Sequence, residues 1–70
     1  MMSSIYKVIE IIGGSDKSWE DAAKRAVETA AKSLKDIRVA EIKELDMRVD
    51  KNKVVEYRVK MRVSFKYTPG

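Results

Sequence analysis

VVEYRVKMRVSFKY, residues Val54–Tyr67, is the stretch that decides the fold, because apolar and polar side chains alternate along it after Val54. Alternation with a period of two is typical of a β-strand with one buried face. Fourteen extended residues span about 45 Å at ~3.3 Å each. A compact chain of this length has a diameter of about 28 Å. The strand is too long to be covered by its own domain, so we expect the chain to be a subunit of an assembly.

The composition restricts the class of function. Seventy residues form one small domain, 1–70, and we expect residues 1–4 and 68–70 to be flexible ends. The chain has no Cys and no His, which removes disulfides, the usual metal ligands and the usual general base. We therefore expect no enzyme activity, and we expect oligomerisation to stabilise so small a core. The absence of Cys also suits a cytoplasmic location.

The charge pattern predicts a solvated surface. Fifteen basic and 11 acidic residues give a net charge of +4, and the two signs are interspersed. The positive balance would permit weak contact with polyanions, but interspersed charges and few aromatic residues favour no nucleic-acid partner. No apolar run approaches the ~20 residues needed to cross a bilayer, and the N-terminus has no signal-peptide pattern, so we expect no membrane partner.

The remaining segments predict an α+β fold with the order β-α-β-β. The expected elements are a strand at Ile5–Ile12, a loop at Gly13–Lys17, a helix from the N-cap Ser18 to about Lys35, a strand at Ile37–Asp50, a three-residue loop at Lys51–Lys53 with Asn52 or Lys53 left-handed, and the long strand. Asp21 takes the capping-box position with a shorter arm than Glu, so only half of the box is expected. The helix places an alanine-rich stripe on one face: Trp19, Ala22, Ala23, Ala26, Val27, Ala30 and Leu34. The prediction is a three-stranded antiparallel sheet partly wrapped around one amphipathic helix.

Charge pairs test the register of the last two strands. With Asp50 opposite Val54, the polar pairs are Arg48–Glu56, Asp46–Arg58 and Glu44–Lys60, and the apolar pairs are Val49–Val55, Met47–Tyr57 and Leu45–Val59. Three opposite-charge pairs on one face support this register. Farther from the turn, the apolar residues Ala40 and Ile42 are at even-numbered positions, whereas Leu45 is at an odd-numbered one, so regular alternation would put them on opposite faces. We therefore predict a β-bulge near Lys43-Glu44.

Four segments, in their order and spacing, resemble the dodecin family: YKVIEIIG at Tyr6–Gly13, SWEDAA at Ser18–Ala23, RVAE at Arg38–Glu41 and VSFK at Val63–Lys66. The resemblance covers about residues 5 to 67. It implies a hollow homododecamer with its helices outward. It also implies storage or sequestration of flavins, riboflavin or FMN, stacked between tryptophans, and no catalysis.

The chain departs from this family at the flavin site. The stacking Trp corresponds to Val39, two residues before the matching Glu41; the flavin-contacting Gln corresponds to Arg58, and an Arg of some bacterial members to Asp46. Val39 gives no aromatic stacking, and Arg58 faces Asp46 in the predicted register. We therefore expect a shell for small-ligand binding or storage in which flavin binding is weak or absent. Flavin storage remains an alternative.

Two other ligand classes stay open. The pattern resembles a flavin-less branch, some members of which are described as calcium-associated, so a calcium-binding structural dodecamer is a further alternative. Hard cations prefer carboxylates, and the candidates are Glu41, Glu44 and Asp46. Cross-strand ion pairing also explains these residues. An anion such as a nucleotide or CoA would use Arg58, Lys60 and Arg62.

Overall fold

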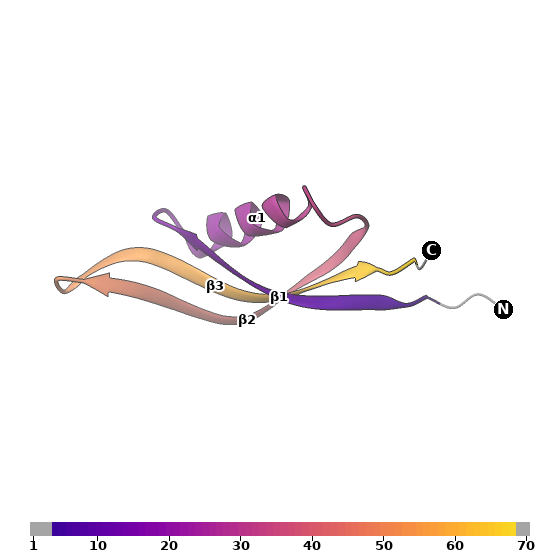
Figure 1. Cartoon of the computed structure of the whole chain (residues 1–70). Helices are drawn as coiled ribbons and strands as arrows, with labels where there is room; N and C mark the ends of the chain where they lie inside the picture. The colour runs from indigo at the N-terminus through magenta and orange to yellow at the C-terminus, as the bar shows by residue number, and fades with distance from the viewer. Residues whose placement is uncertain (1–3, 69–70) are drawn as a thin grey trace.

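The structure, a computed structural model, describes residues 4–68 as one helix on a three-stranded antiparallel sheet (Figure 1). The elements are β1 (Tyr6–Ser15), α1 (Trp19–Ala30), β2 (Ile37–Asp50) and β3 (Lys53–Lys66). The strand order is β1-β3-β2, which confirms the predicted β-α-β-β fold and places β3 at the centre. Of the ends expected to be flexible, residues 1–3 and 69–70 lie outside the described residues.

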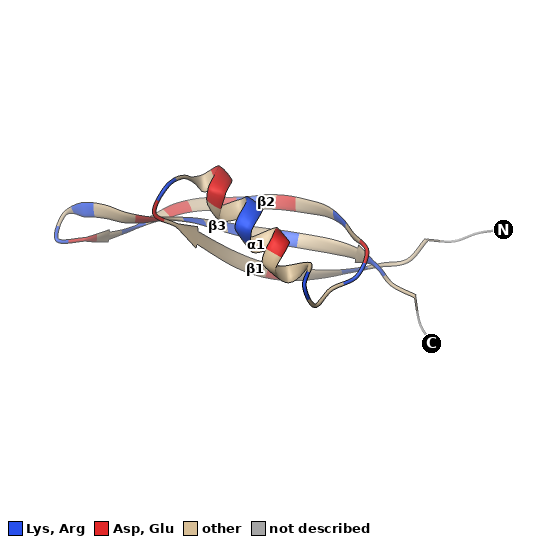
Figure 2. Cartoon of the chain, turned by 90° about the horizontal axis from the view of Figure 1, so that it is seen from above, with Lys and Arg blue, Asp and Glu red and all other residues tan. Residues whose placement is uncertain are grey.

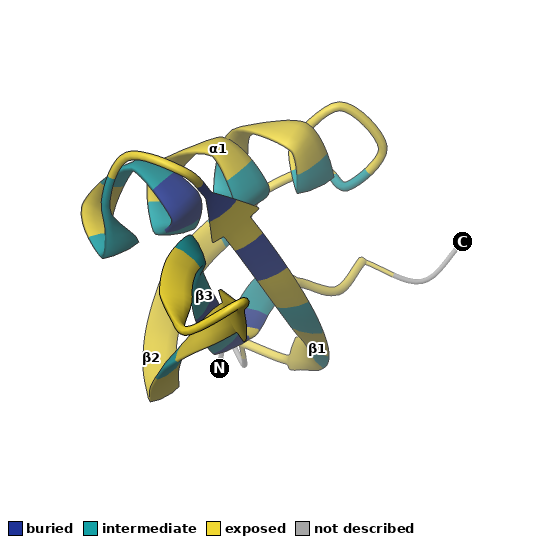
Figure 3. Cartoon of the chain, turned by 90° about the vertical axis from the view of Figure 1, so that its left-hand side faces the viewer, coloured by how far each residue is buried: buried dark blue, intermediate teal, exposed yellow. Residues whose placement is uncertain are grey.

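The core lies between α1 and the central strand. Val59, Met61 and Val63 are the fully buried residues of β3, and they are alternate positions of the strand. Ala22 of α1 is fully buried against Val59 and Met61. Partly buried side chains complete this cluster: Ile11, Trp19, Ala23, Ala26 and Val27. The predicted alanine-rich stripe is therefore the face that α1 turns to the sheet, as the burial colours of Figure 3 show.

α1 begins at the predicted N-cap, Ser18. The Ser18 hydroxyl accepts a hydrogen bond of 2.9 Å from the backbone N–H of Asp21. The Asp21 carboxylate accepts bonds from the Ser15 hydroxyl at 2.6 Å and from Arg25 Nε at 3.1 Å. The hydroxyl half of the capping box therefore forms, as expected, while the carboxylate ties α1 to the end of β1.

α1 ends at Ala30, so the predicted end near Lys35 is wrong. The backbone N–H groups of residues 32 and 33 bond to carbonyls three residues back, both at 3.1 Å, which tightens the last turn. Asp36 then adopts a φ of 62° and redirects the chain into β2. Residues 31–36 therefore form the turn that brings the chain from the end of α1 back to the sheet, where β2 begins.

β1 runs past its predicted end at Ile12 and continues through two glycines to Ser15. Gly13 is required there because α1 crosses β1 very closely. A Cβ at Gly13 would lie 2.6 Å from the carbonyl oxygen of Ala22 and 2.7 Å from the Cβ of Ala26. The glycines therefore belong to the strand that supports the helix, and the predicted loop is shorter.

The β2–β3 hairpin closes with two residues, Lys51 and Asn52, rather than the predicted three. Both have positive φ, 51° and 62°, as a type I′ turn requires. Lys53 belongs to β3 and pairs with Asp50. The prediction that Asp50 faces Val54 is therefore wrong.

The shorter turn changes the register only at the tip. Val49 lies opposite Val54 and not Val55, and Val55 becomes an extra residue of β3. From Arg48–Glu56 onward the predicted register is confirmed, including every charge pair and the remaining apolar pairs.

The predicted bulge in β2 is also confirmed. Ile42 lies opposite Met61 and Glu44 opposite Lys60, so Lys43 has no partner in β3. The extra residue brings the apolar side chains on both sides of it onto the face toward α1. A second register shift lies at residue 38.

The subunit is elongated, as the strand lengths predict. It measures 56 × 20 × 16 Å with a radius of gyration of 14.6 Å, against about 11 Å for a compact chain of this length. Its accessible surface is 5638 Å², whereas a compact 8.0 kDa monomer exposes about 4,450 Å². Within residues 4–68, no helix is long and apolar enough to span a membrane.

Much of the additional surface is apolar. α1 packs on β1 and β3 and contacts β2 through Trp19, so most of the helix side of β2 is uncovered (Figures 1 and 3). Four residues of β2 there are 45–57% exposed, and we call them the β2 strip: Ile42, Leu45, Met47 and Val49. An exposed apolar patch of this kind is typical of an interaction surface.

We expect Gly13→Ala to lower the free energy of unfolding by about 1–3 kcal/mol, because the new methyl group must push α1 away from β1. The measurement is the urea midpoint of unfolding. Gly14→Ala is the matched control, since its Cβ would meet only the side chain of Glu56, which can shift while the backbone stays in place. Equal midpoints for the two variants would contradict the close-approach role of Gly13.

Candidate functional site

The face of the sheet that points away from α1 carries rows of polar side chains, and we call it the polar face. Its rows, from the hairpin toward the chain ends, are Arg48–Glu56, Asp46–Arg58, Glu44–Lys60, Glu41–Arg62–Glu10 and Val39–Ser64–Val8. In three of these rows an acidic residue of β2 lies opposite a basic residue of β3, so the two signs are paired across the strands; Figure 2 shows charged positions of both signs along the sheet. Successive side chains of β3 point to opposite sides of the sheet, so the residues between its buried positions form this polar face.

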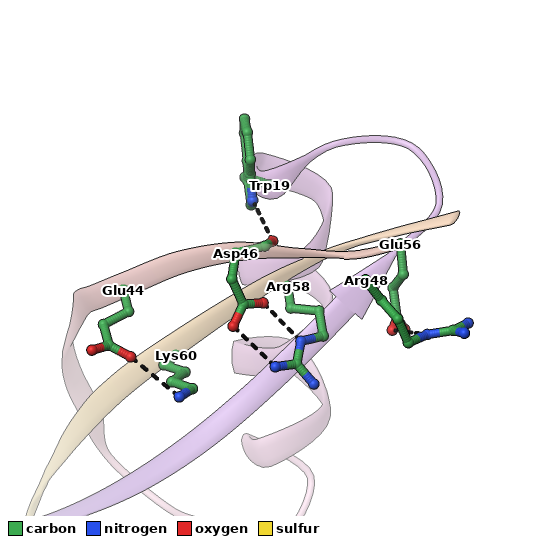
Figure 4. A network of polar contacts seen from close by, with 7 residues as sticks. All are labelled: Trp19, Glu44, Asp46, Arg48, Glu56, Arg58 and Lys60. Carbon is green, nitrogen blue, oxygen red and sulfur yellow. Dashed lines mark hydrogen bonds and ion pairs between the residues drawn. The ribbon is translucent and has the colours of Figure 1, made fainter. Parts of the chain in front are cut away.

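Asp46 and Arg58 form the tightest ion pair of the polar face. Arg58 donates from Nε to Asp46 Oδ1 at 2.7 Å and from a terminal nitrogen to Oδ2 at 2.9 Å (Figure 4). Two parallel bonds between a guanidinium and a carboxylate fix both side chains. Arg58 is therefore occupied by Asp46, as the predicted register implied.

Trp19 contacts the other side of the same strand. Its indole Nε1 donates to the backbone carbonyl of Asp46 at 3.1 Å (Figure 4). Its ring meets that of Tyr57 edge-on, with 5.1 Å between the centroids. Trp19 is thus a partly buried lid at the start of α1. Asp46 is held from both faces of the sheet, by its side chain and by its carbonyl.

The neighbouring rows are paired more loosely. Lys60 Nζ lies 3.2 Å from Glu44 Oε1, and Arg48 Nε lies 3.3 Å from Glu56 Oε1. The last pair, Arg62 Nε to Glu10 Oε2, is 3.6 Å. The cations that could hold an anion, Arg58, Lys60 and Arg62, are therefore all in ion pairs.

Val39 lies in a hollow of the polar face that we call the Val39 hollow. It has a volume of about 560 Å³ and is lined by Val8, Glu10, Val39, Glu41, Arg62 and Ser64. Val39 is 58% exposed there. A hollow of this size is within the range of small-molecule sites.

The structure divides the four residues of the predicted flavin site. Val39 and Glu41 line the Val39 hollow together, whereas Asp46 and Arg58 lie farther along the ribbon. Arg58 and Arg62 are four positions apart on β3, about 13 Å at 3.3 Å per residue. Within one subunit the four candidates therefore do not form a single site.

Glu10 and Val8 are residues of the hollow that the sequence reasoning missed. Both lie on β1, and β1 pairs with β3 by placing Glu10 opposite Arg62 and Val8 opposite Ser64. The charge-pair test applied to β2 and β3 would have found Glu10 if it had also been applied to the first strand.

The three metal candidates lie in separate rows. Glu44 and Asp46 contact basic residues, and Glu41 lies opposite Arg62. Across residues 4–68 the structure contains no group of three acidic side chains that could hold a metal ion. A calcium site built from one of these residues would need further oxygen ligands from backbone carbonyls, waters or another subunit.

We expect Asp46→Asn to lower the urea midpoint at neutral pH. Hydrogen bonds from Arg58 hold the pKa of Asp46 below its ordinary value of 3.8. A carboxyl with a lowered pKa in the folded state stabilises the fold above its unfolded pKa, and the effect is lost as pH falls through the folded pKa. The difference between wild type and variant should therefore disappear on acidification. Glu28→Gln, which removes a carboxylate from the exposed side of α1, is the control; a difference that persists at the acid end would contradict the assignment.

Comparison with known proteins places this geometry in a family. The family model for Dodecin matches residues 5–68. Calcium dodecin of Mycobacterium tuberculosis is 54% identical over 67 residues, 96% of this chain and 94% of its own length. Dodecin of Thermus thermophilus is 32% identical over 65 residues, 93% of this chain and 94% of its own length.

A solved structure agrees with these sequence matches. The crystal structure of the calcium-chelating calcium dodecin of Mycobacterium tuberculosis, described as having a novel calcium-binding site, matches 96% of each chain with a TM-score of 0.84 and 54% identity. Dodecins are non-enzymatic ligand-binding proteins, and the family forms homododecamers. From the family match and the shared fold, we conclude that the chain belongs to the dodecin family.

Proposed function

We propose that this chain forms a homododecameric shell that binds a small ligand and binds flavins weakly or not at all. The assembly is supported by the family and by the excess surface of about 1,200 Å² over a compact monomer. Standard interfaces bury about 800 Å² per partner, so neighbouring copies are a suitable cover for this surface. The β2 strip is the apolar part that such neighbours would bury.

The observation that carries the flavin part of the proposal is Val39. It takes the position of the stacking Trp, and an exposed aliphatic side chain offers an isoalloxazine ring contact area but no aromatic face. Arg58, at the position of the flavin-contacting Gln, has two of its donors on Asp46. A flavin would have to displace Asp46 from Arg58 before those two donors could form hydrogen bonds with it.

Calcium binding is the second candidate function. It is favoured by the 54% identity to a calcium dodecin and by the carboxylates of the polar face, Glu10, Glu41, Glu44, Asp46 and Glu56. Calcium takes six to eight oxygen ligands. Since one subunit does not gather three acidic side chains among its described residues, such a site would lie between subunits and would couple calcium to assembly.

We expect light scattering after size exclusion to give a mass near 96 kDa, twelve copies of the 8.0 kDa chain. A stable 8.0 kDa species would contradict the shell.

The effect of calcium is tested by measuring the mass by light scattering and a melting curve, both in calcium and in EDTA. A lower melting temperature in EDTA would support the calcium function, and identical curves would contradict a structural role for calcium.

We expect Val39→Trp to tighten riboflavin binding about tenfold, because about 1.4 kcal/mol of aromatic stacking is restored. Quenching of riboflavin fluorescence measures the affinity. Ile12→Trp is the control, since it adds the same side chain to an exposed position that does not line the Val39 hollow. Wild-type protein that quenches riboflavin as strongly as Val39→Trp would contradict the proposed loss of flavin binding.

A further inference from the structure

We propose that the Val39 hollow selects organic cations with an apolar body over anionic ligands. The proposal rests on the proposed function, because it requires a shell in which this hollow admits small molecules. It assigns to the hollow a ligand charge opposite to that of FMN, nucleotides or CoA.

The charges of the hollow differ from those of every other row of the polar face. The rows of Arg48, Arg58 and Lys60 each set one carboxylate against one base. The row of the hollow sets two carboxylates, Glu10 and Glu41, against Arg62 alone. The hollow therefore carries one negative charge more than its base can balance.

Glu41 is the carboxylate that is left over. Arg62 contacts Glu10 at 3.6 Å, the longest of the ion pairs, and within the described chain Glu41 has no basic group within 4.0 Å. Lys60, in the adjacent row, already contacts Glu44 at 3.2 Å. A cationic group entering the hollow would find an available partner in Glu41, whereas a phosphate would meet two carboxylates and an Arg that is already paired.

The shape of the hollow supplies the apolar part of the selection. Val8 and Val39 lie on the two outer strands, with Ser64 between them, and both valines are more than half exposed. A ligand whose apolar body covers these two side chains would place its charged group beside the next row, where Glu41 lies. Covering exposed aliphatic surface is favourable without any requirement for an aromatic ligand.

The net charge of +4 acts in the opposite direction, because it attracts anions to the whole subunit. That attraction is long-range and decays over about 8 Å at physiological ionic strength. Glu41 acts at contact distance from a ligand in the hollow, well within that screening length. The local charge therefore decides which ligand stays in the hollow, and the net charge affects only the approach.

Three planar tricyclic dyes of different charge test the proposal: proflavine, a monocation at neutral pH; riboflavin, which is neutral; and FMN, which carries a phosphate. We expect the intact wild-type assembly to bind proflavine most tightly and FMN most weakly, measured by fluorescence anisotropy. Glu41→Gln should weaken proflavine about fivefold, the effect of one unit charge about 4 Å away in water. Glu28→Gln makes the same change of charge on α1, outside the hollow, and should leave the affinity unchanged.

FMN binding as tight as proflavine binding would overturn the proposal. So would equal proflavine affinities for wild type and Glu41→Gln, or an equal loss in Glu28→Gln. Light scattering of the same samples distinguishes failure of the proposed shell from failure of the proposed selection of cations. A monomeric sample contradicts the proposed shell, whereas an intact dodecamer with the wrong order of dyes contradicts only the selection of cations.

Discussion

The packing of α1 onto β3 is the interaction on which the rest of the subunit depends. Val59 and Met61 are sealed by Ala22, and Gly13 allows the helix to come close enough for an alanine to reach them. α1 has 12 residues and is about 18 Å long, whereas β3, with 14 residues, spans about 46 Å. The helix can therefore bury only the middle of the ribbon. The elongated shape and the exposed β2 strip both follow from this difference in length.

The packing of α1 on one side of the sheet also gives the two faces of the sheet different characters. One face is apolar and carries the core and the exposed β2 strip, while the polar face is held by ion pairs. Asp46 belongs to both, because its carboxylate binds Arg58 and its carbonyl accepts the indole N–H of Trp19. A side chain of the polar face can thus change without disturbing the core, because Trp19 bonds to the backbone carbonyl of Asp46 and not to its carboxylate.

β2, β3 and their register could be predicted because the two strands form one hairpin, so paired residues are close together in the sequence. Alternation identified β3, opposite charges aligned Asp46 with Arg58, and the change of phase located the extra residue Lys43. The end of α1 could not be predicted in this way. Residues 31–35 have acceptable helix formers, but the distance back to the sheet requires them to turn.

The Val39 hollow was only half predictable for a similar reason. Val39 and Glu41 were found through the family resemblance, but Glu10 comes from β1, which is separated from β3 by the whole of α1 and β2. Pairing over such a distance leaves a weaker trace in the sequence than a hairpin does. The balance of charge in the hollow, two acids and one base, appears only when all three strands are aligned.

Lys43 shows that the curvature of the ribbon and its chemistry are independent. It is an additional residue of β2 without a partner in β3, so β2 follows a longer path than the strand beside it and the pair must bend. If Lys43 were deleted, Ile42 and Leu45 would still face α1, and Glu41 and Glu44 would still lie on the polar face. Only the arc of the subunit would change. Deletion of this single residue would therefore alter the radius of a closed shell while leaving the two faces of each ribbon as they are.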